Sequence, residues 1–274
     1  MSKKLIVILG PTASGKTEFS INIARLLNNS LPLGGRVRER GSKKFNIEII
    51  NADSRQLYKY MDIGTAKIST KEMQGVPHHL FSVLGPKEKV TVGWYKEKAE
   101  RVIEDVLARG NIPILVGGSM LYISAITDGY VFTGKGGKRA TPVPYDLYMI
   151  GMDIPRPLLY RRINERTKTL LESGWIGEVQ RLLGMGYTVN DPGLKSHGYR
   201  EIADAILNHQ SPVTQLPIIS AKIRQYAKRQ MTWWRHDERI RWINPVGLPR
   251  SLPEDLRAFC ESSLRRGHTH SPVP

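Results

Sequence analysis

Eight residues near the start of the chain have the types and spacing of a phosphate-binding loop. Residues 10–17 read Gly-Pro-Thr-Ala-Ser-Gly-Lys-Thr, the pattern G-x-x-x-x-G-K-[ST] that is also typical of nucleotide and ATP binding. The glycines let the backbone curl so that its amide hydrogens point at phosphate oxygens. Lys16 adds a full positive charge, and the Thr17 hydroxyl can hold Mg²⁺ on the phosphates. The predicted diphosphate or polyphosphate site comprises Gly10, Pro11, Thr12, Ala13, Ser14, Gly15, Lys16 and Thr17.

The sequence on either side of this loop supports the motif. An apolar run at 5–9 precedes it and predicts a strand, and apolar residues at helical spacing follow it from Phe19 to Leu27. The start of a helix adds a partial positive charge at the place where phosphate would bind. The motif does not say which phosphate compound binds, or whether a phosphate is transferred.

A carboxylate is expected to face this loop. Asp53 follows the apolar run at 47–50, and ligands of open α/β sheets bind beyond the carboxyl ends of the strands. A carboxylate there can accept a proton as a general base or hold Mg²⁺ through water. The strand at 112–116 ends in Gly117-Gly118-Ser119, without the acid of many nucleotide hydrolases. Asp53 is therefore the expected catalytic carboxylate, and residues 117–119 leave room for a bulky group.

Two further groups of residues each allow both a functional and a purely structural interpretation. Adjacent His78 and His79 would point to opposite sides of an extended chain, which favours loop packing or a phosphate contact over a metal site. Arg224, Lys228 and Arg235 share one stripe of a predicted helix. That stripe can present cations to a phosphate or to a nucleic-acid backbone, or can simply be solvated. The same choice applies to Arg156, Arg161, Arg162, Arg166 and Lys168.

Charge is the second strong signal. The 274 residues contain 41 Lys and Arg against 25 Asp and Glu, a net charge of +16. Such an excess suits nucleic acid, and an anionic membrane surface is the weaker option. Apolar runs are far shorter than the about 20 residues that span a bilayer. The single Cys260 excludes an intramolecular disulfide and fits a reducing cytosol, so we expect a cytoplasmic protein without a signal peptide.

Alternation of strand-like and helix-like segments predicts an α/β fold. We expect a P-loop-type parallel sheet flanked by helices, with a helical C-terminal half. Predicted strands lie at 5–9, 47–50, 112–116, 145–152 and 239–243, and predicted helices at 16–28, 94–109, 155–173, 175–183 and 217–235.

The chain divides into four predicted parts. A P-loop α/β core covers 1–130, a shortened insertion or linker covers 131–144, the rest of the core with a helical binding part covers 145–250, and a tail covers 251–274. The basic segment 29–46 and the Gly-, Lys- and Pro-rich segment 133–144 are predicted to be irregular loops, and 265–274 a frayed end.

Six motifs in order resemble the tRNA dimethylallyltransferases, also called tRNA isopentenyltransferases. The first is the loop at 10–17, and the second is Ala-Asp-Ser-Arg-Gln at 52–56 with Met-Asp-Ile-Gly-Thr-Ala-Lys at 61–67. The others are Val-Pro-His-His at 76–79, Pro-Ile-Leu-Val-Gly-Gly-Ser at 113–119, Gly-Tyr-Arg-Glu at 198–201 and Arg-Gln-Tyr-Ala-Lys-Arg-Gln-Met-Thr-Trp at 224–233.

The resemblance implies a reaction and its residues. The family moves the dimethylallyl group of dimethylallyl diphosphate onto the exocyclic amine of the adenosine just 3′ of the anticodon. By analogy Asp53 takes the proton, while Thr17, Lys16 and Arg224 stabilise the departing diphosphate with Mg²⁺, which Thr17 helps to hold. The adenine must leave its stack. Residues matching positions that touch the tRNA anticodon stem-loop in relatives are Asp53, Ser54, Arg55, Gln56, Ser119, Ser196, His197, Gly198 and Tyr199.

The chain departs from the family pattern in two places. Ser119 replaces the usual threonine and keeps the hydroxyl. Relatives carry a helical insertion with a His-Pro-Asn-Asp-type motif that touches the anticodon stem, whereas here Tyr130 reaches Tyr145 through a short Gly- and Lys-rich stretch. We therefore expect the core chemistry to be preserved and tRNA affinity to differ. A monomer is expected.

Three other functions compete with this interpretation. A related transferase could act on free adenine nucleotides, but a mononucleotide needs no charge of +16. A P-loop small-molecule kinase would need ATP and release ADP. An RNA-binding protein with a decayed site would not need Lys16, Thr17, Asp53 and Arg224 intact.

Overall fold

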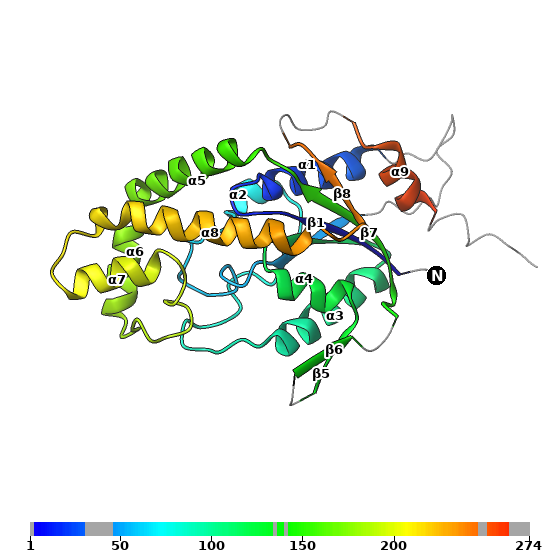
Figure 1. The fold of residues 1–274 in the computed structure, drawn as a ribbon. Helices are drawn as coiled ribbons and strands as arrows, with labels where there is room; N and C mark the ends of the chain where they lie inside the picture. Colours follow the sequence, from blue (N-terminus) through cyan, green and yellow to red (C-terminus); the bar gives the residue numbers. More distant parts are fainter. Residues whose placement is uncertain (1–2, 31–45, 134–135, 140–141, 246–250, 263–274) are drawn as a thin grey trace, which may run out of the picture.

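Strands that are apolar on both faces build the centre of the molecule. The computed structural model describes residues 3–30, 46–133, 136–139, 142–245 and 251–262. Six parallel strands form one sheet in the order β3-β2-β4-β1-β7-β8 (Figure 1). They are β1 (Lys3–Leu9), β2 (Ile47–Ala52), β3 (His78–His79), β4 (Ile112–Gly117), β7 (Tyr145–Met152) and β8 (Ile240–Ile243). Every residue of β2 and β4 is buried, as expected for a parallel sheet that is covered on both faces.

Alternate residues of each strand enter two separate cores. Leu5, Val7 and Leu9 of β1 pack with α3 (Val92–Ala108) and α4 (Met120–Thr127) on one face. Ile6 and Ile8 pack with α1 (Lys16–Ser30) on the other face. The predicted α/β fold with a parallel P-loop-type sheet is therefore confirmed.

The second core also contains a helix that the sequence assigned to a tail. Helix α9 (Glu254–Glu261) buries Leu256 and Cys260 completely against the α1 face of the sheet. Burial raises the pKa of the Cys260 thiol to about 12, which makes it a poor nucleophile. The part of 251–274 that the structure describes is thus integral to the core, and the predicted frayed end at 265–274 lies outside the described residues.

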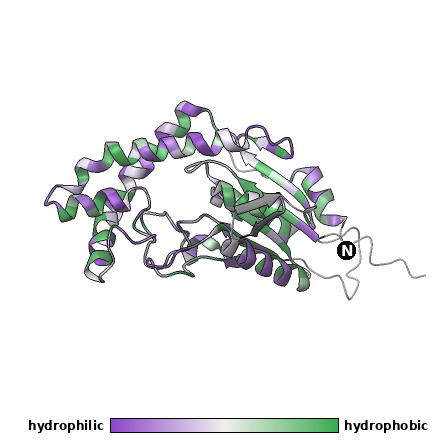
Figure 2. Ribbon diagram, turned by 60° about the horizontal axis from the view of Figure 1, so that its bottom comes forward, coloured by the Kyte–Doolittle hydropathy of each residue, from purple (hydrophilic) through white to green (hydrophobic). Residues whose placement is uncertain are grey.

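The second half of the chain is helical, as predicted. Its helices are α5 (Arg156–Leu170), α6 (Ile176–Gly184), α7 (Tyr199–Leu207) and α8 (Leu216–Trp234), with a π-helical turn at Leu171–Trp175 and a 3₁₀ turn at Pro212–Gln215. Figure 1 shows α5 and α8 side by side and extending beyond the sheet. Figure 2 shows hydrophobic strands in the centre and mixed, partly hydrophilic surfaces on these helices.

Segments predicted to be irregular are partly ordered. Within 131–144, β5 (Tyr130–Thr133) pairs antiparallel with β6 (Gly136–Arg139), so the short region contains a β-hairpin. Short helix α2 (Thr70–Met73) and strand β3 were also not predicted, because elements of four and two residues carry no readable period. The basic loop prediction for 29–46 falls mainly on 31–45, which lie outside the described residues.

A buried tryptophan joins the two halves of the chain. Trp175 is fully buried, and its indole lies against the backbone of Gly64 in the first half and Gly198 in the second. A Cβ atom built on Gly64 or Gly198 would come within 1.9 or 2.0 Å of that ring. Only glycine permits this approach, which explains why both motifs contain one.

A buried carboxylate completes the junction. Glu178 on α6 is 1% exposed and accepts backbone N–H bonds from Asp62, Ile63 and Gly64 at 2.8, 2.7 and 3.1 Å. It also accepts a hydrogen bond from the Tyr199 hydroxyl at 2.5 Å. These charge-assisted bonds hold the segment 62–64 on the helical half, and so fix one wall of the cleft between the halves.

Removing the tryptophan should strongly destabilise the protein. Trp175→Ala is expected to lower the free energy of unfolding by about 3–5 kcal/mol, because it leaves a cavity between the two halves. Trp233→Ala is the matched control, since Trp233 is 47% exposed, and it should cost less than about 1 kcal/mol. Urea denaturation measures both, and equal losses would contradict the assigned role of Trp175.

Candidate active site

The phosphate loop has the expected local structure. Residues 10–17 connect the end of β1 to the start of α1, and Gly15 has φ +84°, a left-handed conformation that glycine adopts without strain. The Ser14 N–H donates to the Pro11 carbonyl at 3.3 Å, which closes the turn. Lys16 Nζ donates to the same carbonyl at 2.6 Å. We call this curled segment, residues 10–17, the cradle.

Asp53 shares a pocket with the cradle. The order β2-β4-β1 separates the end of β2 from the cradle by a single strand. A pocket of about 200 Å³ at this edge is lined by Thr12, Ala13, Lys16 and Thr17 from the cradle and by Asp53 opposite them. The structure therefore brings together the two groups that the sequence predicted would face each other.

Charges in the pocket influence one another. Enclosure of the Lys16 ammonium lowers its pKa to about 8, and the Asp53 carboxylate partly offsets that effect, whereas Arg166 adds to it. Enclosure likewise lowers the pKa of Arg166, opposed by Asp53 and Glu72. Two cations thus face one nearby carboxylate in confined space, which is an electrostatic environment suited to an anionic ligand.

The loop that carries Asp53 is tightly held. Asp53 Oδ1 accepts the Arg55 N–H at 2.8 Å, and the Asn51 side chain bonds both the N–H and the carbonyl of Asp53 at 2.9 and 3.0 Å. The Ser54 N–H donates to Ser119 Oγ at 2.8 Å, which ties this loop to the end of β4. Asp53 is thereby held in one position by its own backbone neighbours.

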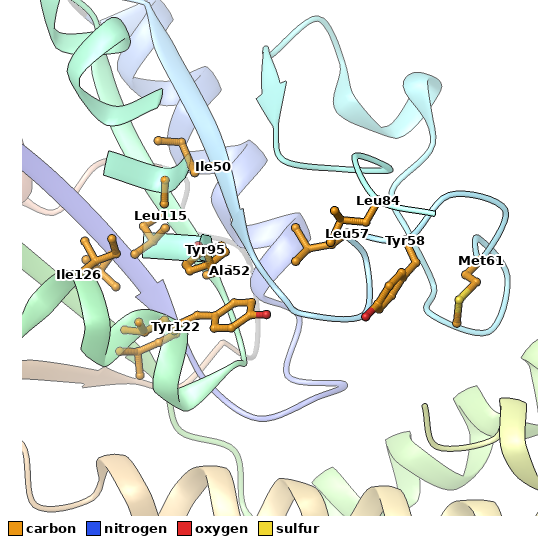
Figure 3. Packing of buried hydrophobic residues seen from close by; sticks show 14 of the residues in the cluster. Ile50, Ala52, Leu57, Tyr58, Met61, Leu84, Tyr95, Leu115, Tyr122 and Ile126 are labelled. Carbon is orange, nitrogen blue, oxygen red and sulfur yellow. The ribbon is translucent and has the colours of Figure 1, made fainter. Parts of the chain in front are cut away.

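Two stacked tyrosines support the end of β2. The rings of Tyr95 and Tyr122 lie 3.9 Å apart and nearly parallel, and Figure 3 shows them near Ala52. The Tyr95 hydroxyl donates to the Asn51 carbonyl at 2.8 Å. Aromatic packing from α3 and α4 thus supports the backbone at Asn51, two residues before Asp53.

Most of the residues predicted to touch tRNA line the same pocket. Five of them line it together with Asp53: Ser54, Arg55, Gln56, Ser196 and His197. Tyr199 also lines the pocket, although its hydroxyl is bound to Glu178. Ser119 and Gly198 lie behind the lining, where Ser119 holds the Ser54 amide and Gly198 packs on Trp175.

Arg224 lies outside the lining of this pocket. Its Nη1 donates to Asn164 Oδ1 at 2.5 Å, and its guanidinium lies over the Tyr160 ring at 5.8 Å, on the other side of α8. The predicted contact of Arg224 with a diphosphate is therefore not made in this conformation, and that role stays a prediction. Arg166 on α5 lines the pocket together with Thr17 and Lys16. The sequence placed Arg166 only in a general basic stripe.

Two other lining residues were not singled out by sequence. Tyr226 and Gln230 are one turn apart on α8 and both reach the Gly118 carbonyl, at 3.3 and 2.7 Å. Burial, reinforced by the Asp53 charge, raises the pKa of Tyr226 to about 12, so its phenol is neutral. A buried glutamine within an apolar stripe is the signal that could have revealed this contact.

The histidine pair behaves as its extended geometry predicted. His78 lines the pocket, while His79 Nε2 lies 2.6 Å from the Glu48 carboxylate on the far side. Within the described residues, no group of three or more His, Cys, Asp or Glu could hold a metal ion. Thr17 and Asp53 are among the oxygen-bearing side chains that line the pocket.

None of the helices in the described part of the chain has the length and apolar character that crossing a bilayer requires.

A parallel sheet with a phosphate loop facing a strand-end carboxylate defines a P-loop α/β protein. The family model described as "IPP transferase" matches residues 56–142 and 132–237, which is more than half of the chain. The chain belongs to the IPP transferase family.

Named relatives agree with this family. A tRNA dimethylallyltransferase of Carboxydothermus hydrogenoformans is 34% identical over 308 positions, covering 89% of this chain and 93% of the relative. The solved structure of the full-length tRNA isopentenylpyrophosphate transferase from Bacillus halodurans has a TM-score of 0.75 at 30% identity, covering 88% of this chain and 90% of that one. The corresponding Staphylococcus epidermidis structure has a TM-score of 0.73 at 31% identity, covering 88% and 92%. These prenyltransferase relatives support neither the kinase nor the free-nucleotide alternative.

The family match is divided into two ranges that meet at the β5–β6 hairpin. The two matched ranges overlap only at 132–142, where the hairpin lies. In the alignment to the C. hydrogenoformans relative, 89% of 274 residues is about 244, so about 64 of the 308 positions are filled by the relative alone.

Replacing Arg166 should weaken anion binding at the cradle. Arg166→Met removes a guanidinium that lines the pocket, so the affinity for inorganic diphosphate should fall about 10- to 100-fold, the value of one or two charge-assisted hydrogen bonds. Isothermal titration calorimetry measures the affinity. Arg161→Met on the same helix is the control, since Arg161 is exposed and pairs with Glu165 at 3.8 Å.

The same titration tests Arg224. A loss in Arg224→Met as large as that in Arg166→Met would mean that Arg224 leaves Asn164 and reaches the ligand. Unchanged affinity in Arg166→Met would contradict the site described here.

Proposed function

We propose that this chain transfers the dimethylallyl group of dimethylallyl diphosphate to the exocyclic amine of the adenosine 3′ of the anticodon in tRNA. The observation that carries the proposal is the single pocket in which the cradle and Asp53 face each other. An anion cradle suits a diphosphate leaving group, and a fixed carboxylate suits an amine that must lose a proton. The names of the relatives supply the substrate class. We further propose that the chain acts as a monomer in the cytoplasm.

In the proposed reaction one bond forms as another breaks. The adenine N6 attacks C1 of the dimethylallyl group, and the C1–O bond breaks with its electron pair leaving on the diphosphate. The N6 proton passes to the Asp53 carboxylate, whose Oδ1 is already held by the Arg55 N–H. The products are the prenylated adenosine and diphosphate, so no phosphoryl group is transferred.

Basic groups of the pocket would stabilise the leaving group. Lys16, Arg166 and the cradle amides are fixed before the reaction and face the place where negative charge develops. The Thr17 hydroxyl also lines the pocket and fits Mg²⁺, which prefers oxygen ligands and binds with few protein ligands when a diphosphate supplies the others. When bound, the metal would neutralise charge on the departing diphosphate.

Aromatic and cationic residues at the pocket would receive the acceptor base. His197 and Tyr226 meet edge to face at 5.9 Å, and the Arg229 guanidinium lies 5.7 Å from the Tyr226 ring. Arg55 adds a further cation to the pocket lining. Aromatic rings and guanidinium groups suit an unstacked adenine and its phosphates, as base flipping requires.

We also infer that the hairpin at 130–139 stands where relatives carry the longer insertion. The division of the family match into two ranges, which overlap at 132–142, supports this inference. The reduced region would leave the reaction pocket intact and remove part of the surface for the anticodon stem.

Nucleoside mass spectrometry tests the proposed function. The chain, dimethylallyl diphosphate, Mg²⁺ and an unmodified tRNA transcript should give N6-dimethylallyl adenosine and an equal amount of diphosphate. AMP in place of tRNA should give little product, and ATP should not yield ADP. Absence of the modified nucleoside, with the diphosphate donor bound, would contradict the proposal.

Asp53→Asn should separate binding from chemistry. The amide keeps an oxygen for the Arg55 N–H but cannot accept the proton, so kcat should fall about 10²–10⁴-fold. The affinity for inorganic diphosphate should not fall. Asp146→Asn, at an exposed position on β7, is the control and should keep wild-type turnover. Wild-type turnover in Asp53→Asn would remove it as the base.

Catalytic efficiency should decline on the basic side of neutrality. Lys16 has a pKa of about 8 in the free protein, so it loses its positive charge as the pH rises through that value. The kcat/KM for the donor, which reports the free enzyme, should therefore fall above pH 8. Arginine stays charged, so in Lys16→Arg this decline should move to higher pH. An unchanged decline near pH 8 in Lys16→Arg would assign it to another group.

A further inference from the structure

We propose that Gln230 is a positioning residue that fixes the distance between the diphosphate cradle and Asp53. This proposal rests on the proposed function and concerns a residue with no reacting atoms. Gln230 is 1% exposed and lies on α8, more than two hundred residues after the cradle. Its side-chain amide bonds in both directions, and each bond ends on backbone at the pocket.

The first bond holds the cradle. Gln230 Oε1 accepts the Thr12 backbone N–H at 3.0 Å. That amide is thereby turned away from phosphate binding, which leaves the amides from Ala13 to Thr17 to form the anion site. The bond also fixes the entry of the curled segment, where a free amide would leave the loop able to shift.

The second bond holds the end of β4. Gln230 Nε2 donates to the Gly118 carbonyl at 2.7 Å. Packing here is so close that a Cβ atom on Gly118 would lie 2.5 Å from Nε2. Gly118 must therefore be glycine for the glutamine to reach its carbonyl.

The next residues carry the connection on to Asp53. Ser119 follows Gly118, its N–H donates to the Ala52 carbonyl at 3.0 Å, and its Oγ accepts the Ser54 N–H at 2.8 Å. A continuous chain of bonds and backbone thus runs from the cradle, through Gln230 and residues 118–119, to the two neighbours of Asp53. Gln230 is the link that comes from outside the sheet.

The expected consequence is a loss of turnover without a loss of binding. Prenyl transfer requires the donor carbon, the amine and Asp53 to align, and a displacement of about 1 Å in such an arrangement can cost about 10²-fold in rate. The amides from Ala13 to Thr17 and the cations that bind the donor are all still present when Gln230 is changed, so the donor should still bind while its alignment with Asp53 is lost. A residue needed only for folding would instead lower the active fraction and leave the remaining molecules normal.

Two variants of Gln230 test the proposal. Gln230→Met removes both bonds at similar volume, and Gln230→Glu keeps an acceptor for Thr12 but cannot donate to Gly118. In each, kcat should fall by about 10²-fold, and in Gln230→Met, which adds no charge to the pocket, the KM for dimethylallyl diphosphate should stay within about threefold. Gln210→Met, at an exposed site after α7, is the matched control. Activity is normalised to the folded fraction measured by circular dichroism.

Amide hydrogen exchange gives a readout that does not depend on turnover. The Thr12 amide should exchange faster in Gln230→Met than in the wild type and should stay protected in Gln230→Glu, because only the first variant loses its acceptor. Normalised kcat within twofold of the Gln210→Met control in either folded variant would overturn the proposal. If the wild type itself makes no prenylated tRNA, the proposed function fails, and the exchange result alone then decides whether Gln230 holds the cradle.

Discussion

The close approach of β4 to β2 is the constraint on which the site depends. A Cβ atom on Gly117 would lie 2.1 Å from the Ala52 carbonyl oxygen, so only glycine fits where the two strands end. Because β4 lies between β2 and β1, this contact brings the Asp53 loop and the cradle to the same edge with one narrow strand between them. A bulky side chain at this point would separate the carboxylate from the anion site. The glycine at the end of β4 therefore keeps the Asp53 loop close to the cradle.

The second constraint is electrostatic. Lys16 and Arg166 are enclosed, Asp53 partly offsets both charges and Glu72 partly offsets that of Arg166, and the depressed pKa of Lys16 records the cost of the enclosure. A bound diphosphate would relieve this cost, since it adds negative charge beside both cations. The helical half supplies Arg166 and also closes the cleft through Trp175 and Glu178. The helical half therefore contributes both to anion binding, through Arg166, and to the contact between the two halves, through Trp175 and Glu178.

Much of the fold could be predicted from the sequence because most of its strands contain apolar runs that amphipathic helices separate. The predicted strand 145–152 agrees with β7, and Asp53 and Lys16 fall in one pocket as expected from strand-end geometry. Which side chains of the helical half enter the pocket could not be predicted. Periodicity treated Arg224 and Arg166 as members of similar basic stripes, and only packing between α5 and α8 decides which of them enters the pocket. The order of 251–262 was missed because a single turn of apolar residues gives too weak a period.

The most direct measurement is a crystal structure of the protein with a non-hydrolysable dimethylallyl thiodiphosphate and an anticodon stem-loop. The two phosphates are expected to bind the amides of 13–17 together with Lys16 and Arg166. The extruded adenine is expected to lie with its N6 within hydrogen-bonding distance of Asp53. A diphosphate bound away from the cradle, or an adenine amine that cannot reach Asp53, would contradict this arrangement.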